Sequence, residues 1–222
     1  MNKYLPMMVT ALVIVVVYAT IALLKKKMAK ELTEAMFSNS KRYKELLYSK
    51  KALLLLDSQV VIILRAQDQF ASGNLEEAKA QLKCVELKRL NPQDLKNVMQ
   101  LRSVIAIETK NKQEHQKIAD DLRKLKNEKN ADWINPMIKK NHINEMLYFD
   151  FDVKVISELR QMIDEAGVES RSILMMSLAK AFHMNHQFKE AKNTLLAAKE
   201  TADEETAKMI DAVINDQSLL DK

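Results

Sequence analysis

An apolar run near the start of the sequence constrains the fold more than any other feature. Leu5–Leu24 contains 20 consecutive residues without a charged side chain. A helix rises about 1.5 Å per residue, so this run spans roughly 30 Å, the thickness of the hydrocarbon core of a bilayer. The run is longer than the apolar region of a signal peptide, and Lys25, Lys26 and Lys27 follow it in place of a small-residue cleavage site. We therefore expect residues 1–24 to form a single transmembrane anchor.

The charges that flank this run are unequal. Lys3 alone precedes it, whereas four lysines follow it closely: Lys25, Lys26, Lys27 and Lys30. Because basic flanks remain in the cytoplasm, the pattern predicts a single-pass protein of the cell membrane, with its N-terminus outside and its C-terminal domain in the cytoplasm. Two alternatives stay open. The small residues at 19–22 permit cleavage of a signal peptide, and the reverse orientation would make the same domain an exported module that acts with chaperones of secreted proteins.

The net charge of +5 belongs mainly to the segment that follows the anchor. Residues 25–51 hold nine Lys and Arg against three Asp and Glu, and their apolar residues recur at helical spacing. We expect a basic helical juxtamembrane stalk, which acts as a spacer or contacts anionic lipid headgroups. Residues 52–222 are close to neutral with both signs of charge mixed, which argues against nucleic acid as a partner.

The composition excludes several kinds of site. The 2 glycines cannot supply a phosphate-binding loop or a dinucleotide-binding fingerprint, both of which need glycine where a phosphate approaches the backbone. A single cysteine, Cys84, excludes an internal disulfide and a cysteine-based zinc site, and we expect its thiol to pack against apolar neighbours. No cofactor is expected. No segment alternates apolar and polar residues for long enough to predict a strand.

The remainder of the chain alternates helical patterns with short polar breaks, which predicts an all-α fold. The first expected helices cover residues 52–70 and 75–90, with a turn at Ser72-Gly73-Asn74 between them. Gly167 is expected to cap the C-terminal end of a later helix, and Ser170 is expected to N-cap the next one. Further breaks are expected at Asn91-Pro92, Lys110–Lys112, Asp150–Asp152 and His186-Gln187.

Helical hairpins recur along residues 53–202. The phrase from Gly73 to Ala78, Gly-Asn-Leu-Glu-Glu-Ala, and the apolar positions of the last hairpin resemble the tetratricopeptide repeat (TPR) family. The matching positions of the last hairpin are Met175, Leu178, Ala179 and Phe182 in its first helix, and Phe188, Ala191, Leu195 and Ala198 in its second. The resemblance implies that residues 52–222 form a TPR-like α-solenoid of about four helical hairpins, each of which buries one face on the next.

The resemblance also implies where partners bind, because the first helices of TPR-like hairpins line a concave surface. The candidates on this surface are Asn141, Glu145 and Tyr148 in the third hairpin, and Met176, Lys180 and His183 in the last. We therefore expect a non-catalytic, membrane-anchored adaptor or scaffold. It would bind protein or peptide partners on its helical surface, at the cytoplasmic face of the membrane.

An enzymatic alternative depends on the histidines. A metal-dependent enzyme would have to bring together His142, His183 and His186 with carboxylates such as Asp150 and Asp152. No third ligand lies close in sequence to His183 and His186, and the acidic pairs stand before helices, where they complement the helix dipole. The sequence therefore favours ordinary polar roles for these residues, with no metal site and no catalytic residues.

Overall fold

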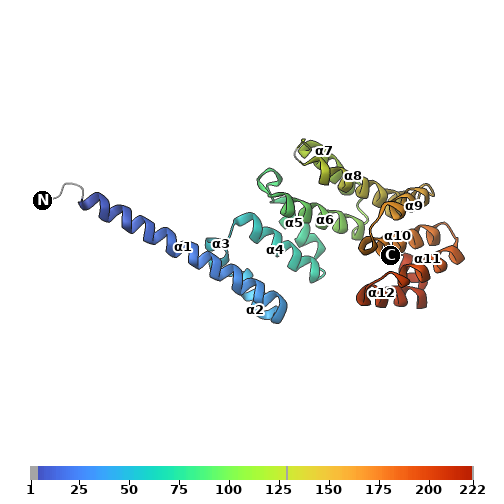
Figure 1. Cartoon of the computed structure of the whole chain (residues 1–222), viewed down its shortest axis with the longest axis horizontal. Helices are drawn as coiled ribbons and strands as arrows, with labels where there is room; N and C mark the ends of the chain where they lie inside the picture. Colours follow the sequence, from blue (N-terminus) through green and yellow to red (C-terminus); the bar gives the residue numbers. More distant parts are fainter. Residues whose placement is uncertain (1–4, 129, 222) are drawn as a thin grey trace. The chain divides into compact units, whose positions relative to one another are not determined.

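The computed structural model describes the backbone of residues 5–128 and 130–221, and the side-chain surroundings of these residues except 5–18, 168 and 169. Within these ranges every regular element is a helix and none is a strand, which confirms the all-α prediction (Figure 1). The chain divides into two compact units between Ile105 and Ala106. We call them unit 1 and unit 2 and describe each by itself.

Unit 1 begins with a long helix that is followed by several shorter ones. In chain order its elements are α1 (Leu5–Ser38), α2 (Ser40–Leu47), α3 (Lys50–Leu55), α4 (Ser58–Ala71), α5 (Leu75–Lys83), the 3-10 turn Leu87–Arg89 and most of α6 (Pro92–Glu108). Polar side chains fix the short breaks between them. Asn39 caps α2 by accepting a hydrogen bond from the backbone N–H of Arg42 at 2.9 Å. The break at Asn91-Pro92 is confirmed, since Pro92 begins α6.

The expected transmembrane segment lies in α1, which continues without interruption to Ser38. Among the side chains that the structure describes, no helix is both long enough and apolar enough to cross a membrane. Residues 1–4 of the expected anchor lie outside the described residues, as do the side chains of 5–18.

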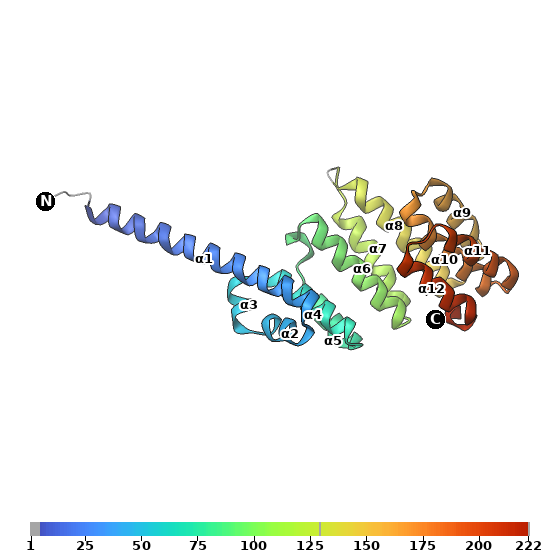
Figure 2. The ribbon, with the colours of Figure 1, turned by 60° about the horizontal axis from the view of Figure 1, so that its bottom comes forward.

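The second half of α1 is packed rather than isolated. An apolar cluster joins it to α2, α3 and α4, which lie beside it (Figure 2). Its buried members are Met28, Leu32, Ala35, Tyr43, Leu46, Leu47, Ala52 and Val61. Residues 25–51, the expected stalk, therefore present a basic exposed face while their apolar face belongs to the core of unit 1.

The expected helix 52–70 is two helices. Leu56 adopts an extended backbone, and the Asp57 side chain accepts a hydrogen bond from the backbone N–H of Gln59 at 2.8 Å, which starts α4. The prediction of one continuous helix was wrong because this N-cap is stronger than the apolar continuity around it. The expected helix 75–90 is also shorter, since α5 ends at Lys83.

A second apolar cluster joins the first hairpin, formed by α4 and α5, to α6. The turn at Ser72-Gly73-Asn74 is confirmed, and Gly73 has a φ of +79°, a conformation that glycine adopts without strain. Ala66 of α4 and Ala78 of α5 are both fully buried, so the two helices approach closely. Around them lie the buried side chains of Ile63, Leu82, Val85, Val98 and Ile105.

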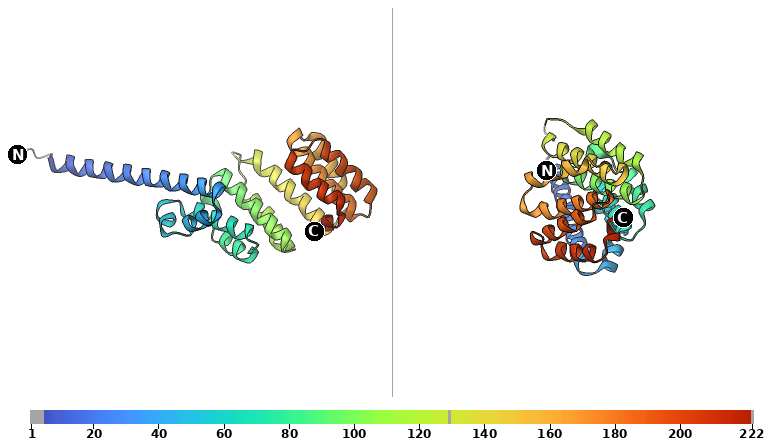
Figure 3. Two further views of the ribbon diagram at one scale, coloured as in Figure 1. Left: turned by 90° about the horizontal axis from the view of Figure 1, so that it is seen from below. Right: turned by 90° about the vertical axis from the view of Figure 1, so that its right-hand side faces the viewer.

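Unit 2 continues the alternation of helices and short turns. After the last residues of α6 come α7 (Lys112–Leu125), α8 (Ala131–Glu145), a π-helical turn (Met146–Asp150), α9 (Val155–Glu165), α10 (Val168–Met184), α11 (Phe188–Glu200), α12 (Glu204–Asn215) and a 3-10 turn (Gln217–Asp221). The helices α9 to α12, coloured orange to red, run side by side (Figure 3). The turn at His186-Gln187 is confirmed, with His186 at a φ of 60°.

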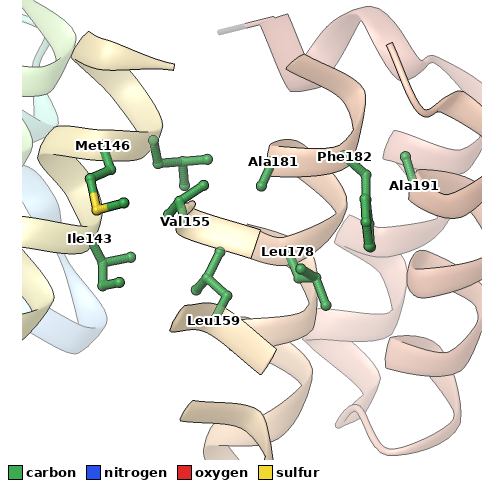
Figure 4. Packing of buried hydrophobic residues seen from close by; sticks show 9 residues of the cluster. Ile143, Met146, Val155, Leu159, Leu178, Ala181, Phe182 and Ala191 are labelled. Carbon is green, nitrogen blue, oxygen red and sulfur yellow. The ribbon is translucent and has the colours of Figure 1, made fainter. Parts of the chain in front are cut away.

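Consecutive hairpins of unit 2 share one core (Figure 4). α8 and the turn that follows it contribute Ile143, Met146 and Leu147, α9 contributes Val155 and Leu159, and α10 and α11 contribute Leu178, Ala181, Phe182 and Ala191. The pair formed by α8 and α9 therefore buries its apolar face on the pair formed by α10 and α11, as stacking of helical repeats requires.

Two capping predictions in unit 2 were wrong. Gly167 does not end α9 but precedes α10 as its N-cap, with an extended backbone at φ −68° and ψ 164°. Ser170, the expected N-cap, lies inside α10, where its hydroxyl donates to the carbonyl of Gly167 at 3.3 Å. A left-handed backbone occurs instead at Phe151, with a φ of 51°, directly after the π-helical turn. A bulky residue in that conformation carries backbone strain.

Candidate functional site

Two of the sequence-predicted residues meet directly in unit 2. Tyr148 lies in the π-helical turn after α8, and Lys180 lies in α10. The Lys180 Nζ stands 4.9 Å from the centroid of the Tyr148 ring, a cation–π arrangement. Burial raises the pKa of the Tyr148 hydroxyl, and the nearby charge of Glu108 adds to the effect. Tyr148 of the third hairpin therefore contacts Lys180 of the last hairpin.

Lys180 is buried, with 7% of its surface exposed. Its Nζ donates a hydrogen bond of 2.6 Å to the main-chain carbonyl of Leu220. Burial lowers the pKa of Lys180, while the carboxylate of Asp221 opposes the shift and Lys110 adds to it. A lysine so far removed from water is rare unless its charge is compensated, and here the compensation comes from an acceptor carbonyl, a carboxylate and an aromatic face.

His183 lies one turn along α10 from Lys180. Its Nε2 is 2.8 Å from Oδ1 of Asp221, and its ring meets the edge of Phe188 at 5.1 Å between centroids. The imidazole of His183 therefore lies between a carboxylate and an aromatic ring. Lys180 and His183 therefore both contact residues near the end of the described chain.

Those contacts belong to Gln217–Asp221, which we call the 217–221 segment. Leu220 is 6% exposed and joins a cluster with Ala179, Leu195 and Ile210. Sequence reasoning missed this segment because it matches no repeat position and because 40 residues separate Leu220 from Lys180. The only available signal was a pair of leucines between acidic residues.

The other candidates have different surroundings. Asn141 is 4% exposed, and its Nδ2 donates to the carbonyl of His115 at 3.2 Å, so it joins α8 to α7 and offers little surface to a partner. Met176 is half-buried and packs on the same cluster as Leu220. Glu145 is half-buried at the edge of the surface and accepts a hydrogen bond from Gln116 Nε2 at 2.5 Å.

An ion-pair group extends the surface beyond Glu145. Lys112 Nζ lies 3.7 Å from Glu145 Oε1 and also forms an ion pair with Asp150. The hydrogen bond to Asp150 raises the pKa of the Lys112 ammonium. Glu145 and Asp150, which lie within three residues of Tyr148, are therefore both paired with Lys112 of α7.

The histidines of the enzymatic alternative do not gather. Among the residues that the structure describes, no group of three or more His, Cys, Asp or Glu side chains could hold a metal ion. His142 lies 4.0 Å from Glu158, whereas His183 faces Asp221, and both His183 and His186 approach the ring of Phe188.

Three further features concern the surfaces of the molecule. An open groove of about 370 Å³ follows α10, and its lining residues are Arg160, Ile163 and Asp164 of α9, Met175 and Leu178 of α10, and Asn193, Thr194 and Ala197 of α11. The expected packing of Cys84 was wrong, because its thiol is exposed. The membrane-flanking candidates Lys25, Lys26, Lys27 and Lys30 are all exposed on α1.

Comparison with protein-family models, with curated proteins and with solved structures finds no match to this chain.

Proposed function

We propose that this protein is a non-catalytic adaptor of the TPR-like type, tethered to the cytoplasmic face of the cell membrane, which binds a protein or peptide partner on the surface around Tyr148 and Lys180. The observation that carries the proposal is the convergence of two hairpins there. Tyr148 and Lys180 come from different repeats and lie in contact, with His183 one turn away. A surface shared by successive repeats is what a solenoid offers to an extended partner.

The packing supports the TPR-like interpretation of the chain. Small residues occupy positions where paired helices meet, and they are fully buried: Ala66, Ala78, Ala179 and Ala191. Any larger side chain at these positions would separate the helices, so the residue type and the geometry agree. The same pattern in the first and last hairpins supports a common repeat.

The tether is supported by the sequence of 5–24 and by the residues that follow it. Lys27 and Lys30 each pair with a glutamate one turn later, at 3.9 and 3.6 Å, so the exposed face of α1 retains its excess of positive charge from Lys25 and Lys26. Beside this half of α1, Leu53 and Leu54 of α3 are 51% and 79% exposed. Exposed leucines next to lysines suit contact with an anionic lipid surface.

Photo-cross-linking of the full-length protein in its own membrane tests the adaptor function. A benzophenone amino acid replaces Gln116, an exposed residue that contacts Glu145. The matched control carries it at Leu196, which is 47% exposed on α11. We expect adducts of defined mass from position 116 and not from position 196. Equal adducts from both positions, or none from either, would overturn the proposal.

A further inference from the structure

The 217–221 segment lies on the residues that a partner of this surface would contact. The Leu220 carbonyl accepts from Lys180 Nζ at 2.6 Å, and Asp221 Oδ1 is 2.8 Å from His183 Nε2. The Leu220 side chain is 6% exposed among apolar neighbours. Three kinds of contact, with a main-chain carbonyl, a carboxylate and an apolar side chain, therefore fall on two consecutive residues.

This pattern is how helical surfaces recognise an extended peptide. An ammonium group that meets a main-chain carbonyl does not distinguish between side chains, whereas the apolar neighbours of Leu220 and the imidazole beside Asp221 each favour one residue type. The pair formed by Leu220 and Asp221 is therefore a short linear motif of an apolar residue followed by an acidic one. It is bound in cis by groups that can bind the same chemistry in trans.

Most side chains of the 217–221 segment are exposed. Ser218, Leu219 and Asp221 are exposed, so Leu220 is the one fully buried side chain among residues 217–221. α12 ends at Asn215, and Asp216 alone joins it to the segment, so the segment stays close to α10 even when detached. A short connection gives such a segment a high effective concentration while its few contacts keep it displaceable.

We propose that the 217–221 segment is an internal competitor, and that the partner it competes with is an acidic peptide carrying an apolar residue followed by a carboxylate. This inference rests on the proposed function, whose binding surface it shares. The partner replaces the Leu220 side chain and the Asp221 carboxylate, and Lys180 keeps a carbonyl acceptor throughout. The competitor also keeps the ammonium of Lys180 compensated in the unoccupied protein.

The test measures binding of a fluorescein-labelled peptide with the sequence of residues 214–222, by anisotropy, to the full-length chain in detergent. The release variant is L220S/D221N, and the matched control is L219S, which alters the exposed neighbouring leucine. If the segment covers the surface nine-tenths of the time, release should tighten binding about tenfold. L219S should bind as the wild type does, and adding K180M to the release variant should abolish binding.

Hydrogen exchange on the unaltered protein covers the case in which the release variant folds poorly. Addition of the peptide should speed exchange of the amides of residues 217–221 and leave α10 protected. Equal affinity of wild type and release variant, or unchanged exchange at 217–221 under saturating peptide, would overturn the inference.

The two proposals fail in different ways. If only the inference of an internal competitor is wrong, the adducts formed at position 116 persist and are unchanged in L220S/D221N. If the adaptor function is wrong, neither the wild type nor the release variant forms specific adducts at that position.

Discussion

Replacement of Leu159 by alanine tests whether the hairpins of unit 2 are joined through one core. Leu159 is fully buried in the cluster that links α8, α9 and α10. Removal of a buried leucine side chain costs about 2–5 kcal/mol, and the upper part of that range applies where neighbours cannot collapse into the space. For a unit of this size, with a urea dependence of about 1.5 kcal/mol per M, a loss of about 3 kcal/mol lowers the midpoint by about 2 M.

The chain offers its own probe for this measurement. Its 1 tryptophan, Trp133, is half-buried in α8, so its fluorescence follows the unfolding of unit 2. The matched control is Leu196→Ala, which removes the same atoms from a side chain that is 47% exposed and should cost less than about 0.5 kcal/mol. If Leu159→Ala moves the Trp133 midpoint no further than Leu196→Ala does, the reasoning about a shared core is refuted.

Three other predictions follow from the structure. Burial lowers the pKa of His115 while Glu145 opposes the shift, so the folded state binds fewer protons than the unfolded state. Unit 2 should therefore lose stability as the pH falls below about 6.5. Urea titrations between pH 7.5 and 5 should show a smaller loss in His115→Phe than in the wild type. Ala179→Leu should destabilise unit 2 by about 1–3 kcal/mol through overpacking, whereas Ala197→Leu, at a half-buried position of α11, should destabilise it less. If the Trp133 titration gives both variants the same loss of stability, α10 and its neighbours do not approach closely at Ala179. Cys84 should react with a membrane-impermeant maleimide after gentle lysis without denaturant, but not in intact cells. Replacement of Lys25, Lys26, Lys27 and Lys30 by glutamine should raise the fraction of protein that is labelled from outside the cell. Full labelling of the unaltered protein in intact cells would mean that the orientation is the reverse of the predicted one.

The elements that could be predicted from the sequence are those with strong local causes. Gly73 can take a positive φ, and Pro92 cannot continue a preceding helix, so the breaks at these positions follow from the residues themselves. The apolar face of α10 and α11 follows from helical spacing. These causes act within a few residues, and they do not depend on how the hairpins pack.

The elements that were wrongly predicted depend on distant contacts or on competition between nearly equal local choices. Gly167 suits a helix end in either direction, and only the packing of α9 and α10 decides that it begins α10. The Asp57 cap competes with an apolar run that would otherwise favour one long helix. The left-handed Phe151 has no local cause, because a bulky residue disfavours that conformation.

The candidate site divides in the same way. Lys180 and His183 could be placed on one face of α10 from their spacing, but their neighbours could not, since the chain must reverse through α11 and α12 before Leu220 reaches Lys180. Asn141 was placed on the surface by the same spacing and is instead buried against α7. Helical periodicity identifies which residues share a face, and only the tertiary structure determines which neighbour covers that face.

Lys180 connects the fold of unit 2 with its proposed role. Lys180 is 7% exposed in this structure, and loss of its acceptors would cost several kcal/mol for as long as the ammonium group stayed buried. If the surface served only packing, an apolar side chain would fill this position at no such cost. A lysine is favoured where one acceptor carbonyl is to be exchanged for another, because the charge then stays compensated before and after the exchange. The 217–221 segment meets that requirement with the Leu220 carbonyl, and the proposed peptide partner would meet it with a main-chain carbonyl of its own.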